Sequence, residues 1–133
     1  MAVHIRVATP VDAEPCGRII YKAFQGVADR HGFAPDFPAV EIATQLARSF
    51  IGHSSIFGVV AEEDGCVVGS NFLGEGDAIR GVGPITVEPR LQGGGIGRRL
   101  MEVVLERGNG AAGIRLLQDT FNMGSISLYA SVG

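Results

Sequence analysis

Apolar and polar side chains alternate in several short stretches of the chain, and this pattern predicts strands. Residues 4–8 alternate like a half-buried strand. Two apolar runs, 56–62 and 66–73, are separated by Glu63-Asp64-Gly65, a sequence typical of a tight hairpin turn. Further strands are expected over residues 80–87 and 113–118.

Apolar residues at helical spacing indicate two helices in the first half of the chain. A turn at residues 9–12 precedes the first helix, and Asp12 is placed to cap it. Its apolar face comprises Cys16, Ile19, Ile20, Ala23 and Phe24. Residues 25–38 are rich in glycine and proline and are expected to form a loop. The second helix is expected to bury Ala39, Ile42, Ala43, Leu46 and Phe50.

Two more helices are expected in the second half. One places Ile96, Leu100, Val103 and Val104 on a single face and ends near residues 108–110, where two glycines flank Asn109. The other covers residues 125–131. The expected order of elements is therefore strand, two helices, three strands, helix, strand and helix.

Length and composition favour one compact domain over residues 1–133. The chain is 46% hydrophobic, which is enough to form a core, and 133 residues are too few for two ordinary domains. A net charge of -3 disfavours a nucleic-acid partner. No apolar run is long enough to cross a membrane, and the N-terminus lacks a leader pattern, so we expect a soluble, cytoplasmic protein without a membrane partner.

Cysteine and histidine usage gives no sign of a metal site. Cys16 and Cys66 lack the spacing of metal ligands or of a redox pair, and we expect both to be buried, reduced thiols. His4 and His53 form no ligand pattern with the acids available. We therefore expect no metal cofactor.

A glycine-dense segment, Gln92-Gly93-Gly94-Gly95-Ile96-Gly97-Arg98, lies between an expected strand and an expected helix. Glycines allow successive backbone N–H groups to turn toward one point, and the first amides of a helix are unpaired, so this segment predicts a phosphate-binding loop. It is not a P-loop, because arginine follows Gly97 where lysine and a hydroxyl residue are needed. It also fails the dinucleotide pattern G-x-G-x-x-G.

The loop does fit Q/R-x-x-G-x-G/A, through Gln92, Gly95 and Gly97. It resembles the acyl-coenzyme A pyrophosphate loop of the GNAT superfamily of N-acetyltransferases. The preceding Ile85-Thr86-Val87-Glu88-Pro89 is similar to the strand that leads into that loop. Asn122, Leu128, Tyr129 and Gly133 look like the series found about thirty residues later. The resemblance covers nearly the whole chain.

The resemblance implies an α/β (α+β) GNAT-like acyl-CoA N-acyltransferase fold, with a mixed, mostly antiparallel sheet and helices on both of its faces. Members of the family typically continue from the last glycine into two further strands, whereas this sequence stops at Gly133. The C-terminal strands are thus missing from the sequence. Either the sequence is truncated or a partner chain supplies the missing sheet edge, for example in a homodimer.

The resemblance also implies roles for individual residues. Acetyl-CoA would be the co-substrate, with its pantetheine arm on the backbone of Ile85 and Val87 and near Asn122. Its pyrophosphate would bind Gln92, Gly93, Gly94, Gly95, Ile96, Gly97 and Arg98. Tyr129 would protonate the departing thiolate, and Glu88 would act as general base, directly or through water. Because Thr86 and Glu88 share one face of a strand, both can instead point away from the pocket, and ordered water can replace a dedicated base.

The acceptor is expected to be a primary amine of a small molecule or peptide. Acidic and aromatic residues between the first two helices, where this family commonly walls the acceptor site, suit a cationic amine: Asp29, His31, Phe33, Asp36 and Phe37. Arginines are expected around the glycine loop: Arg90, Arg98, Arg99 and Arg107. Two other functions stay open, a non-catalytic acyl-CoA sensor of the same fold and a binding protein for another phosphorylated ligand.

Overall fold

A computed structural model describes residues 2–31 and 39–116 of the chain, and of residues 26–31 and 115–116 only the backbone. Within these residues, six strands form one sheet in the order β1-β2-β3-β4-β6, with β5 paired to β3. The strands are β1 (Val3–Val7), β2 (Ile56–Glu63), β3 (Cys66–Gly74), β4 (Ile79–Val82), β5 (Thr86–Val87) and β6 (Gly113–Leu116). Every pairing is antiparallel except β4 with β6, which is parallel.

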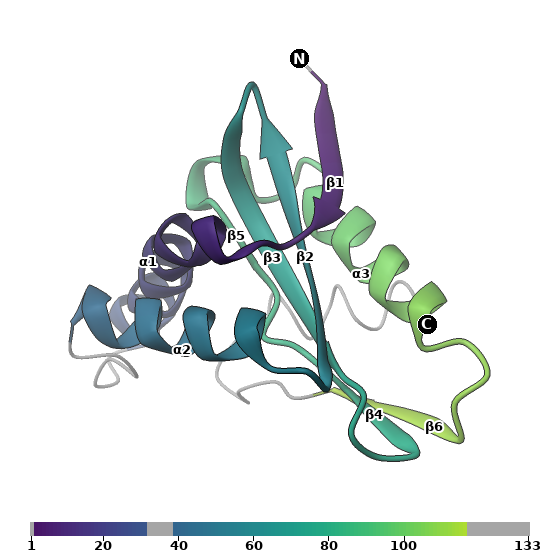
Figure 1. The fold of residues 1–133 in the computed structure, drawn as a ribbon. Coiled ribbons are helices and arrows are strands. Elements are labelled where there is room, and N and C mark those ends of the chain that lie inside the picture. The colour runs from purple at the N-terminus through teal and green to yellow at the C-terminus, as the bar shows by residue number, and fades with distance from the viewer. Residues whose placement is uncertain (1, 32–38, 117–133) are drawn as a thin grey trace.

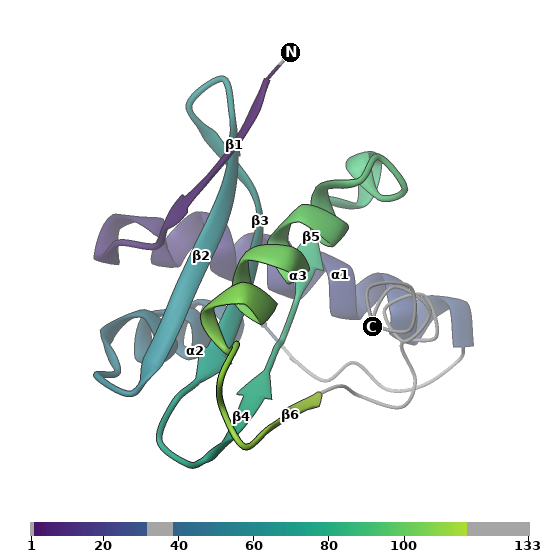
Figure 2. The same ribbon diagram turned by 90° about the vertical axis from the view of Figure 1, so that its right-hand side faces the viewer.

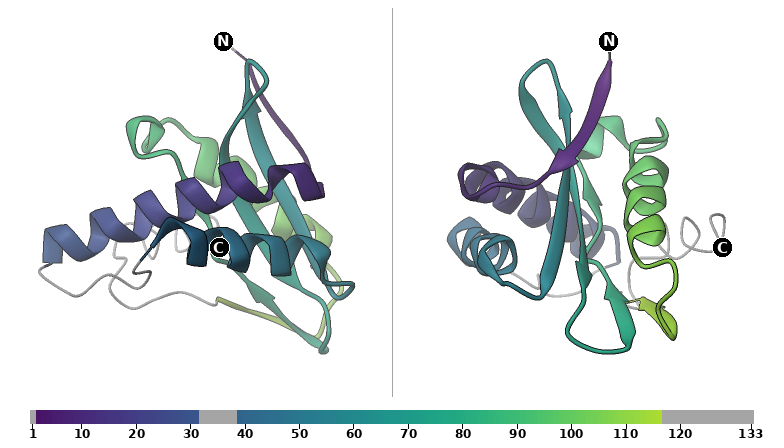
Figure 3. Two further views of the ribbon diagram at one scale, coloured as in Figure 1. Left: turned by 60° about the vertical axis from the view of Figure 1, so that its left-hand side comes forward. Right: turned by 45° about the vertical axis from the view of Figure 1, so that its right-hand side comes forward.

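Helices cover both faces of this sheet. On one side lie α1 (Ala13–His31) and α2 (Val40–Gly52), and on the other lies α3 (Ile96–Arg107), as Figures 1 and 2 show. Figure 3 shows the sheet between the two helical layers. Two short 3-10 turns, η1 (Pro10–Asp12) and η2 (Pro89–Leu91), precede α1 and the glycine loop. The α/β class, the mixed and mostly antiparallel sheet and the helices on both faces are confirmed.

The hairpin between β2 and β3 follows the local signal at its turn. Asp64 and Gly65 are the two turn residues, with φ of 53° and 81°. Left-handed backbone at both positions matches the twist of the flanking strands, and Asp-Gly is among the sequences that adopt it most readily. The tight hairpin is therefore confirmed.

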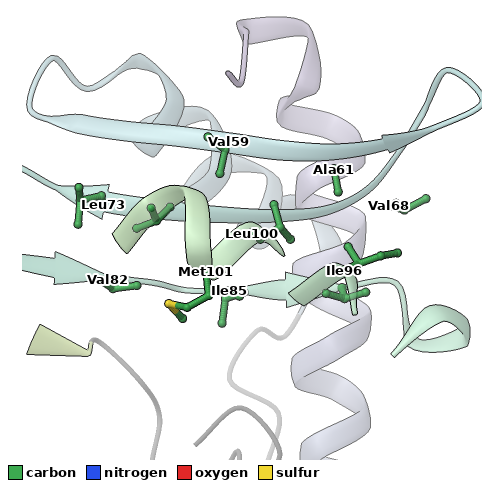
Figure 4. Close-up of a cluster of buried hydrophobic side chains, with 11 residues drawn as sticks. Val59, Ala61, Val68, Leu73, Val82, Ile85, Ile96, Leu100 and Met101 are labelled. Carbon is green, nitrogen blue, oxygen red and sulfur yellow. The ribbon is translucent and has the colours of Figure 1, made fainter. Parts of the chain in front are cut away.

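The hydrophobic core between the sheet and α3 is formed mainly by branched side chains. Figure 4 shows this cluster. It includes Ile85, which directly precedes β5, and Leu100 and Met101 of α3. A second cluster lies on the other face of the sheet, where Cys16, Ile20, Ala43, Ala47 and Val60 are all buried. Each helical layer thus has an apolar contact with the sheet, which holds the ends of the strands in place.

Two expected element boundaries are wrong. Residues 25–31 were expected in a loop, but α1 continues through Gly26 to His31, because one glycine costs a helix only about 1 kcal/mol. The strand expected over residues 80–87 is divided into β4 and β5 by Gly83 and Pro84. Proline has no N–H to donate and so interrupts the ladder.

Three expectations about side chains are also wrong. Ile42 is 44% exposed, because α2 packs on the sheet and on α1 through Ala43 and Ala47 instead. Cys66 is exposed at the first position of β3, next to the hairpin turn, whereas Cys16 is buried as expected. Asp12 does not cap α1; its carboxylate turns back and accepts hydrogen bonds from Thr9 and Arg6. The expected helix over residues 125–131 lies outside the described residues.

Candidate active site

The glycine loop lies between η2 and α3, at the end of α3 that faces away from β6. Gly93 and Gly95 have φ of 89° and 91°, a left-handed conformation that side-chain-bearing residues rarely adopt. The amide of Gly94 donates to the carbonyl of Leu91 at 3.2 Å, which closes a tight turn. Glycine at these positions therefore allows the chain to turn sharply into α3.

Backbone amides of this loop have no hydrogen-bond acceptor in the part of the chain that the structure describes. They are the N–H groups of Gly93, Gly95, Ile96 and Gly97. Those of Ile96 and Gly97 belong to the first turn of α3, where no intrahelical acceptor exists. The helix adds a partial positive charge at the same place. The loop can therefore bind an anion through its main chain alone.

Strand β5 presents backbone groups to the side opposite β3. The amide of Glu88 donates to the carbonyl of Val68 at 2.7 Å, and Val87 is paired with Gly69. Since alternate residues of an antiparallel strand face the neighbouring strand, the N–H and C=O groups of Val87 and of Ile85 point away from β3. The amide and carbonyl of Ile85 have no bond to any described residue. These groups are available to an extended ligand.

The pairing between β4 and β6 ends, within the described residues, before β5 begins. Its last pair is Val82 with Leu116, and no described residue pairs with β5 on that side. Figure 2 shows β6 beside β4 only. The unbonded N–H and C=O of Ile85 and the unbonded N–H of Val87 thus come directly after a parallel ladder in the chain, and they lead toward the glycine loop.

Gln92 connects the strand to the loop. Its side-chain amide Nε2 donates to the carbonyl of Val87 at 3.3 Å. This bond spans η2 and links the first loop residue to the end of β5. The expectation that Gln92 binds the pyrophosphate stays a prediction, and in the structure its side-chain amide is bonded to the strand.

Glu88 lies on the face of β5 that is turned toward α1. Its carboxylate Oε1 is 3.4 Å from the ammonium Nζ of Lys22 on α1. Thr86, two residues earlier, has its hydroxyl 3.3 Å from that of Ser70 on the same buried face. Thr86 and Glu88 therefore share one face, as their spacing predicted. Lys22 did not emerge from the sequence pattern, because its contact with Glu88 joins residues far apart in the chain.

A row of buried polar groups continues from Thr86 into the layer between the sheet and α1. Ser70 and Cys16 are both fully buried there. Burial, together with the charge of Asp12, raises the pKa of the Cys16 thiol to about 12. Cys16 therefore stays a neutral thiol at physiological pH and has a structural role.

Only part of the expected arginine cluster surrounds the loop. Arg90 on η2 lies 3.8 Å from Glu63, and Arg99 donates to the carbonyl of Val3 at 2.9 Å. Arg107 is at the other end of α3, roughly 16 Å along the helix axis from Ile96. It pairs with Glu75 at 2.8 Å and stacks on Phe57. Its expected place near the loop is wrong, since eleven positions along a helix separate it from that loop.

Several expected site residues lie outside the part of the chain that the structure describes. These are Asn122, Tyr129, Phe33, Asp36 and Phe37. Asp29 and His31 belong to the last turns of α1 and not to the expected loop. Among the described residues there is no group of three or more side chains suited to hold a metal ion, and no helix long and apolar enough to span a membrane.

Within the described residues, β5 pairs with β3 alone and leads into a glycine loop whose amides are unbonded. The chain belongs to the Acetyltransferase (GNAT) family, whose sequence model matches residues 18–133. The chain is thus a member of a family of acyltransferases. Comparison with curated proteins gave no significant match.

Solved structures share this fold. A mutant of the BH1408 protein from Bacillus halodurans superposes with a TM-score of 0.81 at 17% identity, covering 98% of this chain and 91% of that one. A GNAT family acetyltransferase from Brucella melitensis, solved in complex with acetyl-CoA, gives 0.68 at 28% identity, covering 93% and 81%. A ribosomal-protein-alanine N-acetyltransferase from Brucella melitensis biovar Abortus 2308 gives 0.68 at 18%, covering 99% and 91%.

Proposed function

We propose that this protein transfers the acetyl group of acetyl-CoA to a primary amine of a small molecule or peptide, by direct attack within a ternary complex. One observation carries the proposal: unbonded main-chain groups run from the N–H and C=O of Ile85 and the N–H of Val87 to the loop amides of Gly93, Gly95, Ile96 and Gly97. A pantetheine arm ending in a pyrophosphate has hydrogen-bonding groups in the same order. The Brucella melitensis relative in complex with acetyl-CoA supports this choice of ligand.

Each part of the site has a distinct task in this proposal. The loop amides bind the pyrophosphate, and Gly94 keeps the turn tight enough to bring them together. The backbone of Ile85 and Val87 holds the pantetheine arm in an extended form, as an added strand. When bound, acetyl-CoA supplies an activated acyl group as a thioester. Gln92 holds the loop against β5 through the carbonyl of Val87.

Proton transfer in the proposed reaction falls to two residues. Glu88 is the proposed acceptor of the amine proton, directly or through water. Its carboxylate lies beside the ammonium of Lys22, so it is placed where a cationic amine can be held. Tyr129, outside the described residues, is proposed to protonate the departing thiolate. Asn122 is proposed to contact the pantetheine arm. These assignments extend the family resemblance to positions of this sequence.

Thermal unfolding in the presence of coenzyme A and acetyl-CoA tests the ligand. Binding to the native state alone adds about 2.7 kcal/mol at a ligand concentration roughly 100-fold above Kd, so the melting temperature rises by several degrees. Gly95→Val abolishes the rise, because the left-handed conformation at this position is lost or strained. Gly110→Val is the matched control, since Gly110 has φ of 94° in open space beyond the other end of α3.

Release of free thiol with a panel of amines tests the chemistry. Turnover in the wild type, lowered about 100-fold in Tyr129→Phe and in Glu88→Gln with Kd for coenzyme A unchanged, is the expected result. Binding without turnover for any amine would instead identify a non-catalytic acyl-CoA sensor. An unchanged melting temperature with coenzyme A, together with a rise caused by another phosphorylated compound, would overturn the proposal.

A further inference from the structure

Lys22 is the one lysine of this chain, against ten arginines. It lies on α1, and its ammonium is 3.4 Å from the carboxylate of Glu88. The lysine side chain is 54% exposed and that of Glu88 is 19% exposed, so the pair sits at the surface with the carboxylate partly covered. An exposed pair of this kind adds little to the stability of the fold.

Lysine differs from arginine in a property that matters beside a thioester. Its amine can lose a proton and become a nucleophile, whereas the guanidinium of arginine remains protonated. In the proposed acetylation, the amine of the external substrate must come into contact with the carboxylate of Glu88. The amine of Lys22 already makes this contact. Lys22 and Glu88 therefore provide, within the protein, the nucleophilic amine and the base of that reaction.

Lys22 lies close to the strand that is proposed to carry the thioester. Glu88 directly follows Val87, whose backbone groups face the open side of β5, and α1 packs against both β5 and η2. Figure 3 shows α1 passing across the strands of the sheet. A nucleophile fixed to the same molecule as the acyl donor reacts at a high effective concentration. An exposed lysine on a flexible four-carbon stem can change its direction without moving α1.

We propose that Lys22 is a site of self-acetylation, modified on Nζ by acetyl-CoA bound to the same molecule. This inference rests on the proposed function. The ammonium of Lys22 first gives one proton to the carboxylate of Glu88, and the carboxylate passes that proton on to water. The neutral amine then attacks the thioester carbonyl, a C–N bond forms and the C–S bond breaks. The second amine proton ends on the sulfur, so coenzyme A leaves as a free thiol.

Acetylation at this position changes the charge of the site. The acetylated amine is neutral and no longer pairs with Glu88. The carboxylate is then released to an external amine. Modification of Lys22 would therefore convert a site occupied by the protein's own amine into one that is open to substrate.

Tryptic peptide mapping by mass spectrometry tests the proposal on the full chain. The unmodified protein is cut after Arg18, Lys22 and Arg30 and yields peptides 19–22 and 23–30. After incubation with acetyl-CoA, cleavage at the modified lysine fails, and one peptide, 19–30, carries an added acetyl group. Lys22→Arg keeps a cation opposite Glu88 and supplies a matched protein that cannot be acetylated there.

Two measurements separate this reaction from chemical acetylation in solution. The fraction of acetylated 19–30 peptide should rise at a rate independent of protein concentration, as expected for a reaction within one molecule. Excess coenzyme A should suppress the rate at least about tenfold by occupying the same loop. This competition uses the wild-type protein, so it does not depend on the folding of a loop variant.

The outcomes distinguish the two proposals. Appearance of the acetylated peptide at a concentration-independent, coenzyme A-sensitive rate supports self-acetylation. A rise of the melting temperature with acetyl-CoA and thiol release with amines, while peptides 19–22 and 23–30 persist, overturns it and leaves the proposed function intact. A rate of Lys22 acetylation in the folded protein equal to that in the urea-unfolded protein also overturns self-acetylation. No thermal shift and no thiol release would overturn both.

Discussion

Gly17 of α1 lies directly against Thr44 of α2, so closely that a Cβ at Gly17 would stand 2.4 Å from the Cα of Thr44. The two helices thus cross at a point where one carries no side chain. This close approach keeps α1 and α2 in one layer over the sheet. It also holds α1, and with it Lys22, in its place beside β5.

Replacing Gly17 with alanine should therefore destabilise the fold. The added methyl group meets backbone as well as side-chain atoms of Thr44, so the helices must separate, at a cost of about 3 kcal/mol. Thermal unfolding should show a fall of roughly 10 °C. Gly52→Ala is the matched control, because a Cβ at Gly52, at the end of α2, meets nothing within 4 Å. Equal melting temperatures for the two variants would contradict this account of the crossing.

Gln92→Ala should weaken coenzyme A binding without unfolding the protein. The bond from Nε2 to the carbonyl of Val87 is the described side-chain link between loop and strand, and a bond of this type contributes about 0.5–1.5 kcal/mol. The dissociation constant, measured by calorimetry, should rise about threefold to tenfold. Gln92→Glu removes the donor at nearly constant size and should have a similar or larger effect. A Kd unchanged in both variants would show that the loop does not need this link.

The two cysteines should differ sharply in reactivity. Cys16 is fully buried and its pKa is raised to about 12, so roughly one thiol in 10,000 is ionised at pH 8. Cys66 is exposed at the start of β3. A thiol reagent should label one cysteine in the native protein and two after denaturation. Cys66→Ser should remove the rapid phase, and a rapid phase that survives this change would place Cys16 within reach of solvent.

Local signals were enough for the fold class, the hairpin and the position of the glycine loop. Asp64-Gly65 and the spacing of the apolar residues act within a few positions, so the sequence alone carries them. The division of the strand at Pro84 was also readable in principle, since proline interrupts a ladder. The apolar run itself continues through Pro84 to Val87, so hydrophobic pattern alone does not mark the break.

Features set by contacts between distant elements were not predictable in the same way. Ile42 is exposed because α2 makes its contacts through two alanines, which the helical period does not distinguish from larger apolar residues. The pairing of Lys22 with Glu88 joins α1 to the end of β5, and no spacing rule connects them. The family resemblance supplied the expected roles of the loop, while the arrangement of its unbonded amides required the structure.

Asp12 should make the stability of the fold dependent on pH in the acid range. Its buried carboxylate accepts a bidentate pair of bonds from Arg6, at 2.8 and 2.9 Å, and another from the amide of Thr9 at 2.7 Å. These bonds, that from Arg6 first, hold the pKa of Asp12 below its ordinary value of 3.8. The folded state therefore binds a proton less readily than the unfolded chain does.

The sign of the effect follows from that direction. The contribution of Asp12 to the free energy of unfolding is complete above pH about 3.8, the ordinary pKa of the group. It is lost as the pH falls through the lower pKa that Asp12 has in the folded state. Asp12→Asn should cost about 1–3 kcal/mol in the free energy of unfolding at pH 7, measured with urea, and the difference from wild type should shrink in strong acid. Asp64→Asn changes a residue at the exposed hairpin turn, where asparagine also adopts positive φ. It should leave the free energy of unfolding and its dependence on pH unchanged. A constant difference between Asp12→Asn and wild type from pH 7 to pH 2 would contradict the assignment.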